Sequence, residues 1–409
     1  MKILKDNIIA SFFIITIMWI SFVPATITAG YANIIYLILG LFLALSFFCS
    51  KKPGYFIYDG FDKVVWLFLI WNLFSALFAY DKHAALKRYI DFVVPFITIY
   101  FLAKNELDNK KIRTFLYLLF FAGVIVSIIG ILEFIYGKDI IYEGFAENSF
   151  YKQYIAIPRV MSTMLHPTIL GTYLMLCLPA SYFVIENNAG RLKKIFSTIG
   201  LFIILIAIML TFSRTAWDIS ALVTFYYFYN RDKKKILLSV VVMILFLCAT
   251  LVLAKFEPRL QYRVDYKQIV SYLINGHRLK RYPLTIKMVK DHPFRGVGPN
   301  NYRLLFDKYY GLNKEPYNIK IPDNMYLAIL GETGLVGILL FMILVLYIIK
   351  KGFILLRDKK NKNWDIGLAI FSCLIGILLH MVSYDLFYWV VPYYLFLLFL
   401  GALMARWLN

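Results

Sequence analysis

The amino-acid sequence predicts an all-α membrane protein with about twelve transmembrane helices. Of its 409 residues, 61% are hydrophobic and 17% are charged, whereas soluble domains are nearer half apolar and a quarter charged. The apolar residues fall in blocks of roughly 20, the length of helix that crosses a bilayer. A transmembrane β-barrel is excluded, because its strands would be short and alternating.

Twelve apolar blocks qualify as spans. Their expected bounds are 8–25, 31–49, 63–80, 88–103, 113–136, 167–186, 195–212, 215–230, 235–254, 323–349, 364–383 and 384–408. The first block follows Lys2 and Lys5, as a signal peptide would. No small-x-small cleavage site follows it and a second apolar block comes at once, so we interpret it as the first helix.

The basic residues predict the orientation of these spans. The loops 51–63, 104–113, 191–194, 231–235 and 350–362 hold 20 Lys or Arg, whereas the short loops alternating with them hold seven. Short cytoplasmic loops are rich in Lys and Arg, so both termini and the basic loops are expected in the cytoplasm.

One long segment interrupts the spans and divides the chain into three parts. We expect spans one to nine in residues 1–254, a mainly helical external loop domain in 255–322, and spans ten to twelve in 323–409. Within the loop domain, stretches near 264–275 and 278–291 have helical character, and a turn-rich run follows.

The loop domain carries much of the net charge of +20, with 14 Lys or Arg. Because the domain lies outside the cytoplasm by alternation, its charge indicates an anionic partner there, such as a phosphate, a pyrophosphate or an acidic sugar. Nucleic acid is not an expected partner.

Arg214 lies between two apolar spans with almost no loop around it. By alternation it faces the outside, where a cation at the membrane edge is costly without a partner. A guanidinium presents a planar fork of donors to a phosphate or carboxylate, so we interpret Arg214 as half of an anion site. The alternative is an arginine whose head group reaches the lipid headgroups.

Four residues of the loop domain are further candidates for this anion site. Arg278 and Arg281 are three residues apart, which places them on one face if the stretch is helical. A solvated basic face is the alternative. The backbone N–H groups of Gly296 and Gly298 could also bind an anion, although a structural turn is the simpler interpretation.

Two acids mark the start of the tenth span. Asp323 directly precedes the apolar helix, where it is the N-cap, a general base for an acceptor hydroxyl, or both. Glu332 lies two to three turns into the span. An acid there is costly, so it should pair with an arginine or face a cavity.

Arg159 and His166 lie at the external start of another span, where they either extend the anion site or stabilise the loop. The histidines lack metal-ligand spacing, and so do the four cysteines. We therefore expect neither a metal nor another cofactor.

Three sequence motifs occur in a characteristic order. They are Ser213-Arg214-Thr215-Ala216-Trp217, the run from Gly276 to Pro299 that contains Asp291-His292-Pro293, and Asp323-Asn324 leading into Gly331-Glu332-Thr333-Gly334. With the twelve-span plan and the external loop between spans nine and ten, they resemble the O-antigen ligase and O-antigen polymerase superfamily of bacterial envelope glycosyltransferases.

The resemblance implies transfer of a glycan from undecaprenyl diphosphate to a glycan or lipid A-core acceptor, at the periplasmic face of the bacterial inner membrane. Such a transferase, embedded among membrane lipids, needs no metal. Arg214 and Arg278 match the arginines that bind the donor diphosphate in the ligases. Asp323, followed by Asn324, stands where the ligases have a histidine that activates the acceptor, and this departure inclines us slightly towards a polymerase.

Two other functions remain open. A flippase for lipid-linked oligosaccharides, or a polysaccharide exporter, would place its functional charges along a central cavity, whereas most of these spans lack charge in their central turns. A non-catalytic envelope scaffold would leave the costly Arg214 and Glu332 unexplained.

Overall fold

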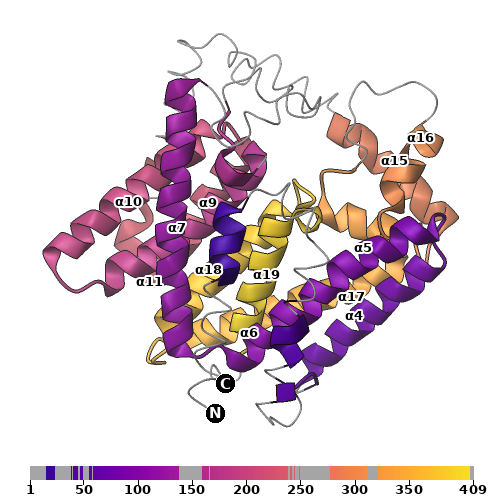
Figure 1. The fold of residues 1–409 in the computed structure, drawn as a ribbon, viewed down its shortest axis with the longest axis horizontal. Coiled ribbons are helices and arrows are strands. Elements are labelled where there is room, and N and C mark those ends of the chain that lie inside the picture. Colours follow the sequence, from indigo (N-terminus) through magenta and orange to yellow (C-terminus); the bar gives the residue numbers. More distant parts are fainter. Residues whose placement is uncertain are drawn as a thin grey trace.

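The computed structural model describes residues 15–23, 40–44, 47–48, 55–57, 59–137, 159–164, 166–237, 277–310 and 321–405, together with isolated positions at 38, 240, 241, 244 and 248. Over this part of the chain it is built from helices and loops and contains no strand. The α-helices are α4 (Gly60–Leu77), α5 (Lys82–Pro95), α6 (Phe101–Glu106), α7 (Asn109–Tyr136), α9 (Pro167–Asn187), α10 (Arg191–Leu210), α11 (Arg214–Arg231), α15 (His277–Asp291), α16 (Asn301–Tyr310), α17 (Met325–Arg357), α18 (Trp364–His380) and α19 (Val390–Leu403). Figure 1 shows their arrangement.

Five of these helices, α4, α7, α9, α10 and α17, are long and apolar enough to cross a membrane. Two shorter apolar helices, α18 and α19, accompany them. Each begins within about six residues of a predicted block, which confirms a helical membrane protein. Half or more of each of the expected spans 8–25, 31–49 and 235–254 lies outside the described residues, so the total of twelve spans stays a prediction.

Two predicted starts, at 88 and 384, each differ from the structure by six residues. The block 88–103 belongs to a helix that begins at Lys82, because the Asp81 side chain accepts a hydrogen bond from Ala84 N at 3.0 Å and caps it. It continues through a π-helix, η1 (Phe96–Tyr100), into α6. The last block starts later than expected, at Val390, because residues 381–389 form a loop that contains the 3₁₀ turn η6 (Leu386–Tyr388).

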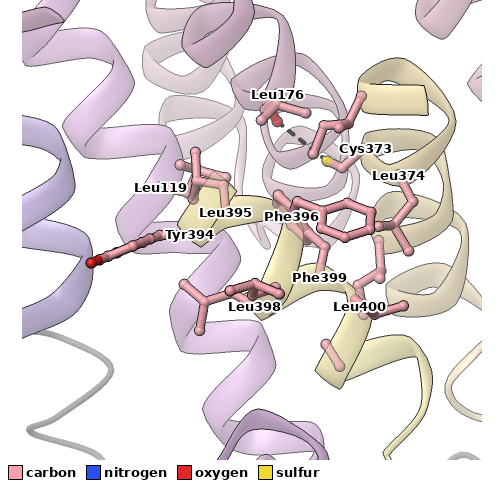
Figure 2. Close-up of a cluster of buried hydrophobic side chains, with 14 of the residues drawn as sticks. Leu119, Leu176, Cys373, Leu374, Tyr394, Leu395, Phe396, Leu398, Phe399 and Leu400 are labelled. Atoms are coloured by element: carbon pink, nitrogen blue, oxygen red, sulfur yellow. Dashed lines mark hydrogen bonds between the residues drawn. The ribbon is translucent and has the colours of Figure 1, made fainter. Parts of the chain in front are cut away.

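Helices α9, α18 and α19 form the centre of the molecule, with α10 and α11 on one side and α4, α5 and α17 on the other (Figure 1). Helix α9 is apolar on all faces and almost completely buried, as expected of a helix enclosed by others. Figure 2 shows the core between these helices, in which Phe396 and Phe399 pack and the Cys373 thiol donates to the Leu176 carbonyl oxygen at 3.4 Å.

The described residues 277–310 of the predicted loop domain have a small core of their own. Helix α15 matches the predicted stretch 278–291, whereas α16 was not predicted and the stretch 264–275 lies outside the described residues. Leu284 and Met288 of α15 pack against Tyr302 and Phe306 of α16. Both helices contact α17, so the domain is seated on the tenth predicted span.

A break in α17 receives the turn-rich run of the loop domain. Gly334 leaves the helical conformation at φ 70°. The turn pairs with the break through Val297 N to Gly331 O at 3.0 Å, and Leu335 N to Pro293 O at 2.8 Å. The loop domain is thereby fixed by backbone hydrogen bonds to a membrane helix.

Candidate functional site

Asp323 and Arg281 form a largely buried ion pair at the start of α17. Arg281 Nη1 donates to Asp323 Oδ2 at 2.9 Å and to the Ile321 carbonyl oxygen at 2.9 Å. The side chains of Arg281 and Asp323 are only 4% and 16% exposed. A guanidinium bound to two acceptors is held in orientation, and it holds the carboxylate in turn.

Asp323 is not the helix cap, so that alternative is wrong. The N-cap is Asn324, whose side chain accepts from Leu327 N at 3.1 Å. Asp323 stands one residue earlier in the left-handed region, at φ 50°, a strained conformation for a residue other than glycine and one that clusters at functional sites. Its carboxylate is therefore directed to Arg281 rather than to the helix end.

Arg214 is the first residue of α11. The preceding turn is tight, with Phe212 at φ 47°. The start of α11 packs closely on α9, as Gly171 shows: a Cβ added at Gly171 would lie only 2.6 Å from Ala216 Cβ. Arg214 is partly exposed and interacts electrostatically with Asp218, one turn further along α11. The side chain therefore stands at a helix N-terminus, where backbone N–H groups favour anions.

Arg159 and His166 stabilise this region from the neighbouring loop. Arg159 Nε donates to the Thr211 carbonyl oxygen at 2.9 Å, next to the Arg214 turn. His166 is the N-cap of α9 and accepts from Thr168 N at 3.1 Å. Burial, and then the charge of Arg159, lower the pKa of His166 to about 3, so its ring is neutral.

The loop 381–389 and the end of α18 join these parts, a role that the sequence did not reveal. Met325 N donates to the Met381 carbonyl oxygen at 2.8 Å, which ties the start of α17 to the end of α18. The buried His380 lies 3.2 Å from the hydroxyl of Thr215, the neighbour of Arg214. The polar residues Ser383, Tyr384 and Asp385 within an apolar hairpin were the only signal of this role.

Tyr384 and Trp389 of the same loop pack against the His166 ring, with ring centroids 5.6 and 5.3 Å away. The loop and the end of α18 together therefore contact the starts of three helices, α9, α11 and α17, that carry candidate site residues.

Glu332 faces a small cavity, which is one of the two surroundings that the sequence predicted for it. The cavity of about 40 Å³ is lined by Arg88, Glu332 and Tyr388 among mostly apolar residues, and it has room for a water molecule. The Tyr388 hydroxyl donates to the Glu332 carboxylate, and the Arg88 guanidinium lies 4.3 Å from the centroid of the Tyr388 ring. The positive charge of Arg88 also attracts the Glu332 carboxylate, and this attraction offsets the free-energy cost of placing an acid within a span.

Gly296 and Gly298 have their N–H groups occupied within the protein. Gly296 N donates to the His292 carbonyl oxygen at 3.0 Å and Gly298 N to the Glu332 carbonyl oxygen at 2.8 Å. A Cβ on Gly296 would lie 2.4 Å from the Glu332 carbonyl carbon, at a φ of 67°. These contacts favour the structural interpretation of both glycines over binding of an anion.

Arg278 lies in the first turn of α15, so the predicted helical spacing to Arg281 holds. Its side chain lies outside the part of the structure that is described. Arg281 itself is engaged with Asp323, which makes it a positioning residue for that carboxylate in this structure.

The site residues thus form two groups bridged by the end of α18. One group is Arg159, His166 and Arg214 at the starts of α9 and α11. The other is Arg281, Asp323 and Asn324 at the start of α17. Together they present arginines and one oriented carboxylate at the same end of the helix bundle.

A comparison with known families finds a similarity, and it covers this region. The family model described as O-antigen ligase matches residues 199–342, which contain most of α10, all of α11, the loop domain and the first half of α17. No curated protein matches the chain. The match contains Arg214, Arg281 and Asp323, and with it the motifs on which the resemblance rested. Residues 199–342 of this chain are therefore similar to the O-antigen ligase family, which confirms the resemblance to the O-antigen ligase and polymerase superfamily.

Proposed function

We propose that this protein is an integral-membrane glycosyltransferase that moves a glycan from undecaprenyl diphosphate onto a sugar hydroxyl at the periplasmic face of the bacterial inner membrane. The observation that carries the proposal is the Asp323 carboxylate, held by Arg281 at the end of the bundle that also bears Arg214. We favour a polymerase, with a glycan acceptor, over a ligase that acts on a lipid A-core.

The donor diphosphate would bind at Arg214 and Arg278. Each guanidinium offers parallel donors to phosphate oxygens, and the N-terminus of α11 adds a partial positive charge beside Arg214. As the bond to the leaving diphosphate breaks, negative charge grows on the diphosphate. Cations placed there beforehand stabilise the transition state more than the ground state.

The acceptor would approach Asp323. Its hydroxyl oxygen attacks the anomeric carbon from the face opposite the diphosphate, so the configuration at that carbon inverts. The bonding pair leaves with the diphosphate, and the hydroxyl proton passes to the Asp323 carboxylate. Arg281 keeps that carboxylate in place for the transfer.

The orientation of the charges supports this location. The basic residues of the predicted cytoplasmic loops gather at the opposite end of the helices, where Arg231 at the end of α11 pairs with Glu186 at the end of α9. Arg214 begins the helix that Arg231 ends. If the basic end is cytoplasmic, the site faces the periplasm.

The proposal is tested in a deletion strain complemented with Arg214→Ala, Arg278→Ala or Arg303→Ala. Arg303 is an exposed arginine of α16 in the same loop domain and is the matched control. We expect the first two variants to lose the long-chain glycan ladder while the third keeps it, with equal amounts of protein in the membrane.

The extracted lipid intermediates discriminate the functions. Loss of the ladder with single repeats still attached to the acceptor identifies a polymerase, and long chains stranded on the lipid carrier identify a ligase. Single repeats trapped on the cytoplasmic side would contradict the proposal and identify a flippase. A normal ladder with Arg214→Ala would remove Arg214 from the site.

A further inference from the structure

We infer that His380 is a positioning residue that fixes the turn carrying Arg214 through the hydroxyl of Thr215. The inference rests on the proposed function, because it concerns how Arg214 is held for a lipid diphosphate. His380 is the last residue of α18 and is fully buried.

The ring of His380 connects two other helices. Its Nδ1 lies 3.0 Å from Thr172 Oγ1 in α9, and its Nε2 lies 3.2 Å from Thr215 Oγ1 in α11. Both hydroxyls are close enough for hydrogen bonds. A single side chain therefore bridges the central helix and the first turn of α11.

The hydrogen-bond pattern assigns the direction of the bond to Thr172, and a neutral ring then sets the direction of the bond to Thr215. The Thr172 hydroxyl gives its one proton to the Thr168 carbonyl oxygen at 2.8 Å, so it can only accept from His380 Nδ1–H. In a neutral imidazole with the proton on Nδ1, Nε2 is an acceptor. The Thr215 hydroxyl must then donate to Nε2, which leaves Thr215 Oγ1 to accept from Ser213 Oγ at 3.4 Å.

The series of hydrogen bonds from Thr172 through His380 and Thr215 to Ser213 fixes both neighbours of Arg214. Ser213 is the N-cap of α11 and Thr215 is its second residue. The Ser213 hydroxyl is directed to Thr215, and the Thr215 hydroxyl is directed to His380. Close packing supports the same turn from α9, since a Cβ on Gly171 would lie 3.6 Å from Ser213 Cβ. The backbone at Arg214 is thereby held on both sides, and less orientational freedom is lost when the guanidinium binds a diphosphate.

Helix α11 also supplies a matched control. Thr224 is buried in the same helix, and its hydroxyl lies 2.8 Å from the Tyr182 hydroxyl of α9. Like Thr215, Thr224 therefore makes a hydrogen bond to an aromatic side chain of another helix. It lies more than two helical turns away from Arg214. Thr224→Val removes such a bond without touching the Arg214 turn.

The test measures binding of undecaprenyl diphosphate to the purified full-length protein in nanodiscs. For Thr215→Val we expect about fivefold weaker binding, the size of one hydrogen bond, and for Thr224→Val we expect wild-type binding. His380→Asn should match Thr215→Val, because the amide can still donate to Thr172 but is too short to reach Thr215. Thermal unfolding of each variant verifies that it is folded.

A double-mutant cycle decides whether the effect passes through Arg214. In an Arg214→Ala background, Thr215→Val should weaken binding no further. An equal loss with and without Arg214, or wild-type binding by Thr215→Val, overturns the inference. If Arg214→Ala alone leaves binding unchanged, the donor site of the proposed function fails instead.

Discussion

The two ends of the helix bundle treat their charges in different ways. At one end, which we call the ion-paired end (Asp62, Lys104, Glu186, Arg231 and Asp365), basic and acidic side chains pair across helices. At the other, the arginine end (Arg159, His166, Arg214, Arg281 and Asp323), Arg281 pairs with Asp323, both Arg159 and Arg281 donate to backbone carbonyl oxygens, and a histidine is kept neutral. The first pattern neutralises charge within the protein, whereas the five residues of the arginine end include three arginines for one carboxylate.

The buried pair of Lys104 and Asp62 is the extreme case at the ion-paired end. Lys104 Nζ lies 2.6 Å from Asp62 Oδ1, with side chains 1% and 0% exposed. The Tyr100 hydroxyl, at the end of the π-helix, donates to the same carboxylate at 2.7 Å. All of this charge is satisfied inside the protein, so the comparison predicts a structural role for this end and a chemical role for the other.

The largest effect on activity is expected at Asp323. Asp323→Asn should lower the transfer rate by about 100-fold or more, because an amide cannot take the acceptor proton. Asp323→His should keep part of the activity, since imidazole is a base and stands at this place in the ligases that the chain resembles. Rates are measured with the purified protein and a lipid-linked donor. Full activity of Asp323→Asn would reduce Asp323 to a residue that only orients the acceptor.

The largest effect on stability is expected at the opposite end. Lys104→Met should destabilise the protein by about 3–5 kcal/mol, because it leaves the Asp62 carboxylate buried without its cation. The double variant Lys104→Met with Asp62→Asn should recover most of that loss. Unfolding is followed by denaturant titration in detergent. A change in the rate per folded molecule, rather than in stability, would break the distinction between the two ends.

A smaller effect is expected where the loop domain meets α17. Gly334→Ala should destabilise the protein by about 1–3 kcal/mol, because alanine is strained at a φ of 70° and its Cβ would lie 2.2 Å from the Phe294 carbonyl oxygen. Gly137→Ala, at φ 67° with open space around it, isolates the backbone strain from the clash. Equal losses in the two variants would mean that the contact with the loop domain contributes nothing.

The smallest effect concerns pH. The folded-state pKa of His166, about 3, lies below the ordinary value near 6.5, so the unfolded chain binds a proton that the folded protein does not. The contribution of His166 to the free energy of unfolding is therefore fully present above pH ~6.5, and it decreases as the pH drops towards 3. His166→Asn keeps an N-cap and removes the titration. Its melting temperature should fall less between pH 7 and 4.5 than that of the wild type, and an identical fall would contradict a neutral buried His166.

The sequence predicted the parts of the site that depend on local pattern. Apolar blocks located the described helices within a few residues, and its place as a lone arginine in a short turn made Arg214 a candidate. The position of Asp323 was predicted but its conformation was not. Asp and Asn are equally good caps, and it is the hydrogen bond from Leu327 N to the Asn324 side chain that shows that the cap is Asn324.

Contacts between distant segments could not be predicted in this way. His380, Met381 and Tyr388 reach Thr215, Met325 and Glu332 from a largely apolar hairpin. Their partners are 56 to 165 residues away along the chain, and hydrophobic periodicity holds no information about such pairs. Gly296 and Gly298 were ambiguous for the same reason, because the carbonyl oxygen that occupies the Gly298 N–H comes from α17.

The most direct test of the proposed function is release of undecaprenyl diphosphate from a lipid-linked glycan by the purified protein in liposomes. We predict that the wild type and Arg231→Ala, at the ion-paired end, release the carrier as the glycan joins its acceptor. Arg214→Ala, at the arginine end, should release at least about 100-fold less, the usual cost of losing one transition-state donor. Glycan that crosses the membrane while still attached to its carrier, with equal behaviour of Arg214→Ala and Arg231→Ala, would contradict a transferase with its site at the arginine end.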